Sequence, residues 1–214
     1  MSQVPNFPLT SIERQLKTHA ILCTTGFLIL LPVGVLVPRY TRTYTKKWFP
    51  VHLAIQLCIS APVIFAGWAL GHKSAGQLGL PHFTDTHQKV ALALLILYIV
   101  QLVLGLGIHW VKPRWLSGRP PQNYVHAVLG LIILVLAAYQ VHYGLYTEWA
   151  FATGGLHVVP DSAKQAWLAL VVIFWVLYGM GLILLPRQFK QEKRIVRPDD
   201  GIPLGSGSTL ENRA

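Results

Sequence analysis

The chain has 214 residues, of which 53% are hydrophobic and only 12% are charged, and its mean hydropathy is +0.47. A soluble domain carries about 25% charged residues, so the composition excludes an ordinary soluble globular protein. The formal net charge of +10 comes mostly from Lys and Arg gathered on one side of apolar stretches, so no nucleic-acid partner is needed to explain it.

Five uncharged stretches follow one another along the chain. Each reaches the roughly 20 residues that a helix needs to cross a hydrocarbon core about 30 Å thick. None alternates polar with apolar residues, as the strands of a membrane β-barrel do. We therefore predict an all-α membrane protein with five transmembrane helices, at about 18–38, 48–72, 87–111, 122–147 and 165–186.

The segments outside this 18–186 membrane domain are polar. Residues 1–17 lack an apolar run before a small-residue cleavage site, so we expect a short outer N-terminus and not a signal peptide. Residues 187–214 turn abruptly polar, which predicts a disordered cytoplasmic tail. Cys23 and Cys58 both fall inside predicted helices, so no disulfide framework is expected.

The placement of Lys and Arg predicts how the helices are oriented. Of the 18 such residues, 13 fall on the face that holds loops 39–47 and 111–122 and the tail, and five fall on the other face. The positive-inside rule assigns the richer face to the cytoplasm. The N-terminus is then extracellular or lumenal and the C-terminus cytoplasmic, in the plasma membrane or an endomembrane.

A histidine stands near the start of each of the first four predicted helices: His19, His52, His87 and His126. Consecutive helices run in opposite directions, so His19 and His87 share the outer side and His52 and His126 the inner side. Ionisable residues inside a membrane are costly and need a partner. Two opposed histidines at one depth suit the axial positions of a haem iron, and bis-histidine ligation favours electron transfer over oxygen chemistry. We predict a four-helix core with two haem groups, plus one C-terminal helix.

The other five histidines do not extend this pattern. His142 and His72 lie about 160° and about 200° around the helix from the predicted ligand of their own helix, so we expect them to face elsewhere. His109 lies roughly 33 Å beyond the ligand of its helix, outside the hydrocarbon. His82 and His157 fall in loops.

Residues one turn after the predicted ligands share their helix face. Gly130 follows His126 by four residues, and its small size is expected to let a flat ring approach the backbone. Gln56 follows His52 by four residues and is expected to hydrogen-bond within the cofactor site. The alternative is that such small residues serve helix packing alone.

Of three alternatives to haem-mediated electron transfer, zinc binding is disfavoured and the other two remain open. Zinc needs four tetrahedral ligands at one place, which two separated pairs do not offer. A haem-free transporter would typically add buried acids, and none of the eight Asp and Glu residues lies inside a predicted helix. The third alternative is a haem-bearing anchor subunit of a partner oxidoreductase.

Four stretches around the histidines carry a family resemblance. They are H-A-I-L…P-V-G…P-R-Y at 19–40, W-F-P-V-H-L-A-I-Q at 48–56, H-Q-K-V-A…Q-L-V-L-G at 87–105 and N-Y-V-H-A-V-L-G at 123–130. In order and spacing they resemble the cytochrome b561 family, particularly the branch often fused to an extracellular DOMON domain. The resemblance implies two haem b groups, held by His19 with His87 and by His52 with His126.

The resemblance also implies electron transfer from cytosolic ascorbate to an outer acceptor, and hence an ascorbate-dependent ferric or monodehydroascorbate reductase. Only 18 residues precede His19, so we expect neither a DOMON domain nor an additional N-terminal helix. The acceptor is then a small molecule or an extracellular redox protein that docks in trans. Membrane lipid is the other expected partner, and a homodimer stays open.

The basic inner loops suggest where the donor binds. A basic mouth concentrates anions such as ascorbate. Arg39 ends the first predicted helix within the P-R-Y stretch. We expect it to pair with a haem propionate or with the donor through a bidentate contact. The alternative is that these basic residues only set topology and contact anionic lipid.

Overall fold

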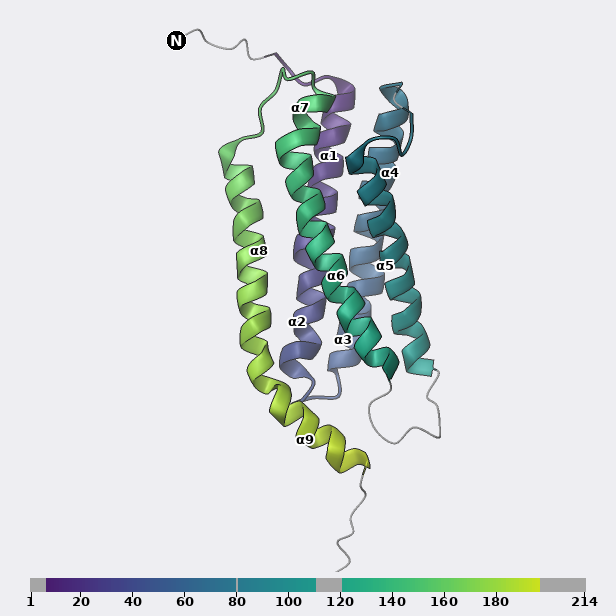
Figure 1. Ribbon diagram of the computed structural model, residues 1–214, viewed down its shortest axis with the longest axis vertical. Coiled ribbons are helices and arrows are strands. Elements are labelled where there is room, and N and C mark those ends of the chain that lie inside the picture. The colour runs from purple at the N-terminus through teal and green to yellow at the C-terminus, as the bar shows by residue number, and fades with distance from the viewer. Residues whose placement is uncertain (1–6, 80, 111–120, 197–214) are drawn as a thin grey trace, which may run out of the picture.

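The structure is a computed structural model that describes residues 7–79, 81–110 and 121–196. Its helices form five long, roughly antiparallel rods (Figure 1). Each rod is long and apolar enough to cross a membrane, which confirms the predicted all-α architecture and makes the chain an integral multi-pass membrane protein. The rods comprise α1 (Ser11–Thr25), a π-helical turn (Gly26–Leu30) and α2 (Leu31–Thr41); α3 (Trp48–Leu53), a π-helical turn (Ala54–Ser60) and α4 (Ala61–Gln77); α5 (Thr86–Trp110); α6 (Pro121–Tyr143), a π-helical turn (Gly144–Glu148) and α7 (Trp149–Ala152); and α8 (Asp161–Gly181), a 3₁₀ turn (Leu182–Leu184) and α9 (Leu185–Val196).

The first rod begins earlier than the uncharged stretch predicts, at Ser11 and not near 18. Thr10 and Glu13 form a capping box: the Glu13 backbone N–H donates to Thr10 Oγ1 at 3.2 Å, and the Thr10 N–H donates to Glu13 Oε2 at 2.6 Å. Such a cap satisfies the free donors of a helix start. The helix therefore continues past the hydrocarbon, through charged residues that a hydropathy count excludes.

The last rod also extends further than expected. Helix α9 continues to Val196, whereas the polar composition predicts a disordered tail from 187. Residues 197–214 of that tail lie outside the described residues, as do 111–120 of the predicted inner loop. Figure 1 shows α9 turning away from α8 at the end of the bundle where α2 and α3 meet, which is the predicted inner end.

Two π-helical turns occupy similar places in the first two rods. Each ends directly before a helix with a proline near its start, Pro32 in α2 and Pro62 in α4. Proline has no N–H and clashes with the preceding turn, and a wider turn accommodates it. These turns change the rotation of every residue that follows, which matters for the site.

The rods pack as two antiparallel hairpins. Helix α1 lies along α4, and α5 lies along α6, while α8 contacts the outside of α2 and α6 (Figure 1). Apolar side chains fill the middle of the four-helix core, among them Phe27, Ile64, Tyr98 and Ile133, all at most 7% exposed. Outward faces carry exposed apolar side chains, as expected for a surface in contact with lipid.

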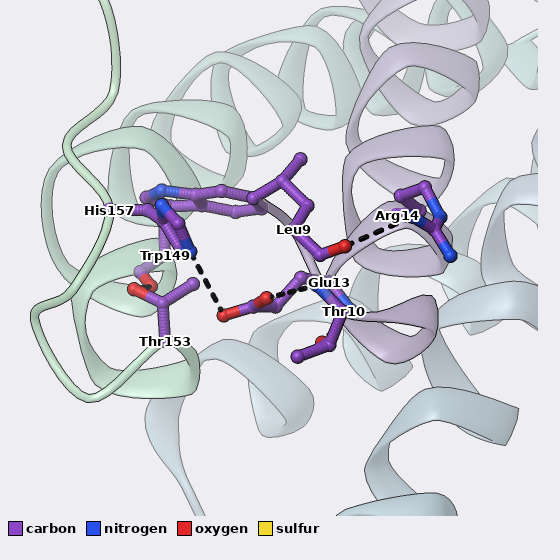
Figure 2. Close-up of polar contacts among 7 residues, drawn as sticks. All are labelled: Leu9, Thr10, Glu13, Arg14, Trp149, Thr153 and His157. Carbon is purple, nitrogen blue, oxygen red and sulfur yellow. Dashed lines mark hydrogen bonds and ion pairs between the residues drawn. The ribbon is translucent and has the colours of Figure 1, made fainter. Parts of the chain in front are cut away.

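A polar contact joins two segments at the opposite end of the bundle, the predicted outer end. His157, in the loop between α7 and α8, lies with its Nε2 3.6 Å from Glu13 Oε1, and Glu13 is buried (Figure 2). Thr153 Oγ1 donates to the Trp149 carbonyl at 2.8 Å in the same group. The loop after α7 is thereby held against the start of α1.

Candidate functional site

Two histidines face each other near the outer end of the core. His19 comes from α1 and His87 from α5, so the pair spans the two hairpins. Their ring centroids are 6.2 Å apart and their planes are inclined by 79°. A cavity at this end is lined by both rings together with Cys23, Ala91 and Gln140.

The inner end repeats this arrangement. His52 from α3 and His126 from α6 have ring centroids 6.4 Å apart, with an interplanar angle of 77°. Both predicted pairs of histidines therefore lie side by side in the structure. Each pair joins a residue of the first hairpin to a residue of the second.

Backbone carbonyls orient one histidine of each pair. His19 Nδ1 lies 2.7 Å from the Gly67 carbonyl oxygen, and His52 Nδ1 lies 2.6 Å from that of Gly34. A carbonyl oxygen can only accept, so Nδ1 carries the hydrogen in both rings and Nε2 keeps its lone pair. Histidines that bind metals are typically held in this way, with the second ring nitrogen donating to a carbonyl or carboxylate.

Glutamines contact the other histidine of each pair. Gln140 Nε2 donates to the His87 carbonyl at 2.8 Å and lies 3.0 Å from His87 Nδ1. Gln101 Nε2 donates to the His126 carbonyl at 2.8 Å. In both cases the glutamine lies on the helix antiparallel to that of the histidine it contacts.

The site therefore has an approximate two-fold repeat. In the first hairpin, each histidine bonds the carbonyl of the glycine that lies 15 residues after the other histidine. In the second hairpin, each glutamine lies 14 residues after the histidine of its own helix and donates to the histidine of the other helix. Fifteen residues of helix correspond to about 22 Å, which separates the two pairs in depth. These equal spacings are visible in the sequence and could have indicated the repeat. Composition and hydropathy do not reveal it.

Glycines let the rings approach neighbouring backbones. A Cβ built on Gly71 would lie 2.7 Å from the His19 ring, and one on Gly105 would lie 2.9 Å from His126 Cε1. Real Cβ contacts are not this short, so a side chain at either position would displace the histidine. Small residues are used in this way where membrane helices approach closely.

Two residues expected beside the cofactor have other contacts. Gln56, in the π-helical turn after α3, donates from Nε2 to the Leu31 carbonyl at the start of α2, at 3.2 Å. Beside Gly130 lies the Gln101 amide, 2.9 Å from where a Cβ would stand. The space at Gly130 therefore admits a glutamine side chain, because α5 and α6 pack at this level.

Arg39 lies between α2 and α8. Its Nη2 donates to the Tyr178 hydroxyl at 2.7 Å, and its guanidinium carbon stands 4.7 Å from the centre of the Tyr178 ring. Its buried Nε has no hydrogen-bond partner among the described residues. The arginine thus keeps one buried donor uncommitted, and its side chain runs along Gly181 of the fifth rod.

Several residues at the outer cavity were not expected there. His72 lines this cavity and stacks on Trp68 and on His82, with centroid distances of 5.2 and 4.0 Å. The prediction that His72 faces elsewhere assumed a constant 100° per residue, and the π-helical turn between His52 and His72 breaks that count. The acid Glu148 also lines the cavity, because the fourth rod continues to Ala152 and not to 147.

The paired rings fit haem ligation. Iron–nitrogen bonds of about 2 Å, with about 1 Å from each nitrogen to its ring centre, place two axial imidazole centres about 6 Å apart. The observed separations of 6.2 and 6.4 Å agree with this spacing. Within residues 7–79, 81–110 and 121–196 there is no group of three or more His, Cys, Asp or Glu placed to share one ion.

Comparison with known proteins extends this picture. Residues 18–152 match the family of eukaryotic cytochrome b561. This match covers more than half of the chain and includes all four paired histidines. The chain belongs to the eukaryotic cytochrome b561 family. Members of that family are b-type haem proteins that carry electrons in membranes.

Individual relatives come from plants and animals. A cytochrome b561 and DOMON domain-containing protein of Arabidopsis thaliana is 29% identical over 165 residues, covering 75% of this chain and 37% of the relative. A probable transmembrane ascorbate ferrireductase of the same plant is 26% identical, covering 62% and 56%. A plasma membrane ascorbate-dependent reductase of Rattus norvegicus is 28% identical, covering 54% and 41%.

The chain spans about a third of the length of the DOMON-containing relatives that it matches first. No solved structure matches the chain significantly.

Proposed function

We propose that this b561-family protein carries electrons across a membrane through two haem b groups. The observation that carries the proposal is the geometry of the two histidine pairs, with ring separations of 6.2 and 6.4 Å at opposite ends of one helical core. His19 with His87 would hold the outer haem, and His52 with His126 the inner one. When bound, each haem would supply a one-electron iron couple.

The chain's own residues set the conditions for this transfer. The carbonyls of Gly67 and Gly34 keep a hydrogen on Nδ1 of His19 and His52, which leaves Nε2 available to iron. Buried apolar side chains exclude water from the layer between the pairs. Phe27 and Tyr98 lie in this layer with ring centroids 6.0 Å apart, and the Tyr98 hydroxyl donates to the Gln56 carbonyl at 3.2 Å.

We assign the donor to the inner face and propose cytosolic ascorbate. The names of relatives in both plants and animals refer to ascorbate-dependent reductases. The inner ends of α2 and α3 carry a basic cluster that would attract this anion, and Arg39 keeps one buried donor without a partner in the described structure. The cluster consists of Arg39, Arg42, Lys46 and Lys47.

The acceptor lies on the outer face, at the cavity beside His19 and His87. A ferric chelate, monodehydroascorbate or an extracellular redox protein docking in trans would all receive electrons there. The N-terminus is then outer and the C-terminus cytoplasmic, in agreement with the distribution of Lys and Arg.

Two measurements test this function. The purified protein should show a bis-histidine b-type spectrum with two haems per chain. Proteoliposomes loaded with ascorbate should reduce an external ferric chelate with no other protein present, when the basic inner face is turned inward. A protein without haem would overturn the proposal, and haem without turnover would identify an anchor subunit that needs a partner.

A further inference from the structure

The second hairpin carries one spacing twice. His87 is followed after 14 residues by Gln101 on α5, and His126 is followed after 14 residues by Gln140 on α6. Because the helices are antiparallel, each glutamine arrives beside the histidine of the other helix. Both amides donate to the carbonyl of that histidine at 2.8 Å. The glutamine that stands near each haem site therefore comes from the helix whose own histidine serves the opposite site.

These glutamines leave polar atoms without partners in the described part of the chain. Oε1 of Gln101 and of Gln140 are both buried and form no hydrogen bond, and the same holds for Nδ1 of His126. Buried polar atoms in native proteins are nearly always paired, so each exception points to a missing component or to a rearrangement. At the inner site, an acceptor and a ring nitrogen without partners belong to two residues that are already hydrogen-bonded to each other.

Ligation decides which hydrogen bond is needed. An imidazole that binds iron through Nε2 carries its hydrogen on Nδ1, so Nδ1 of His87 and of His126 become donors. The Gln140 amide now presents Nε2, itself a donor, 3.0 Å from His87 Nδ1. Two donors cannot bond each other, whereas a shift of the amide that keeps Nε2 on the His87 carbonyl would present the free Oε1 to Nδ1.

We propose that Gln140 and Gln101 are positioning residues whose Oε1 atoms accept the Nδ1–H of His87 and His126. The inference rests on the proposed haem ligation. It gives a Nδ1 partner to His87 and His126, the two ligands that no backbone carbonyl holds. An acceptor at Nδ1 makes the imidazole more electron-donating and so stabilises the oxidised iron. Each glutamine thereby lowers the reduction potential of one haem.

The alternative is a purely structural role, in which these amides only join α5 to α6, as polar side chains do between membrane helices. That role predicts a loss of stability or haem content when the glutamine is removed. It predicts no change in the potential of the haem that remains bound. The potential and the spin-resonance signal of each oxidised haem therefore separate the two roles.

The test uses reciprocal variants of the full chain. In Gln140→Leu the midpoint potential of the outer haem should rise and that of the inner haem should stay unchanged. Gln101→Leu should raise only the inner potential. Gln140→Glu and Gln101→Glu keep an acceptor oxygen, so they should not raise it. His87→Ala and His126→Ala assign the two signals, because each leaves one haem.

Unchanged potentials in both leucine variants, or a rise in the haem of the glutamine's own helix, would overturn the proposal. If a leucine variant does not fold, Gln140→Met or Gln101→Met decides, because methionine has a similar length and no strong acceptor: a raised potential of the contacted haem supports the proposal, and an unchanged potential contradicts it. Failure of the proposed function is distinguished beforehand, because the unaltered protein would then lack two haems.

Discussion

The surroundings of Nδ1 differ between the two histidines of each pair. For His19 and His52 the neighbour is a backbone carbonyl, at 2.7 and 2.6 Å. For His87 it is a glutamine amide at 3.0 Å, whereas Nδ1 of His126 has no hydrogen-bond partner among the described residues. A backbone carbonyl cannot be removed by a side-chain substitution. Substitutions nearby therefore leave the Nδ1 contacts of His19 and His52 in place, whereas replacing Gln140 removes the Nδ1 contact of His87.

Removal of the rings themselves gives the most direct prediction. His19→Ala or His87→Ala should release the outer haem and leave the inner one, and His52→Ala or His126→Ala the reverse, because a bis-histidine site loses an axial ligand. The measurement is the ratio of haem to protein with reduced-minus-oxidised spectra. His142→Ala is the control, since His142 stacks on Tyr146 away from either pair. Unchanged haem content in any one of the four ligand variants would contradict the assignment.

Arg39 tests the donor side. Arg39→Ala should slow reduction of the inner haem by ascorbate at low salt, where charges are least screened, because the basic cluster attracts the anion. Reduction by a neutral quinol should keep its wild-type rate. Tyr178→Phe is the matched control: it removes the hydroxyl that Arg39 bonds at 2.7 Å and keeps the charge. Equal ascorbate rates in Arg39→Ala and wild type would leave Arg39 with a topological and packing role.

The two hairpins reach their positions through different devices. In the first, π-helical turns before Pro32 and Pro62 rotate the inner and outer halves of each rod relative to each other. In the second, α5 is apolar all round, and its register with α6 is marked by glutamines and glycines. Gly105 is the clearest case, because its missing side chain leaves room for the His126 ring.

Two glycines of α5 make a controlled comparison. Gly105→Ala should disturb the inner haem, because the new Cβ would lie 2.9 Å from His126 Cε1 and the ring must move. Gly107→Ala should leave haem binding unchanged, since nothing lies within 4 Å of its Cβ position. Both gain about 1 kcal/mol of helix propensity, so a difference between them reports the contact and not the helix. Spectra and haem content are the readouts, and equal spectra for the two variants would contradict the packing described.

At the scale of the whole molecule, the five rods place one histidine pair near each membrane face. The apolar middle of the core separates the pairs, and the loop after α7 is held against the start of α1 through Glu13 and His157. The basic residues gather at the opposite end. Orientation in the membrane therefore decides which pair meets the cytosol.

Accessibility of single cysteines tests this orientation. On a background without Cys23 and Cys58, Val158→Cys should react with an impermeant thiol reagent only from outside, and Lys46→Cys only from inside. Both positions are exposed in the structure, with Val158 at 81%. The physical basis is the excess of Lys and Arg at the inner end. Three of the five spans lie between the two positions. Labelling of both positions from the same side would contradict this topology.

Much of the helical architecture and the grouping of histidines is encoded locally. Uncharged length determines that five helices cross the membrane, and alternation of direction brings His19 toward His87 and His52 toward His126. Helix ends at Ser11 and Val196 were not accessible to this reasoning, because backbone hydrogen bonding continues into charged residues. Hydropathy reports the solvent around a helix, whereas capping and packing decide where the helix stops.

Tertiary structure alone decided the surroundings of the rings. A helix with regular turns places His72 away from His52's face, but a π-helical turn brings it to the outer cavity. The small size of Gly130 predicts space for a flat ring, but the Gln101 amide lies beside it. Arg39 was expected at a haem propionate or the donor, and its side chain lies against Tyr178 of the fifth rod. The physical reason is the distance in sequence over which each feature acts. Apolar length and residue order act along one helix. The Nδ1 partners, the close glycine contacts and the stacking of Arg39 depend on the register between helices, which only packing determines.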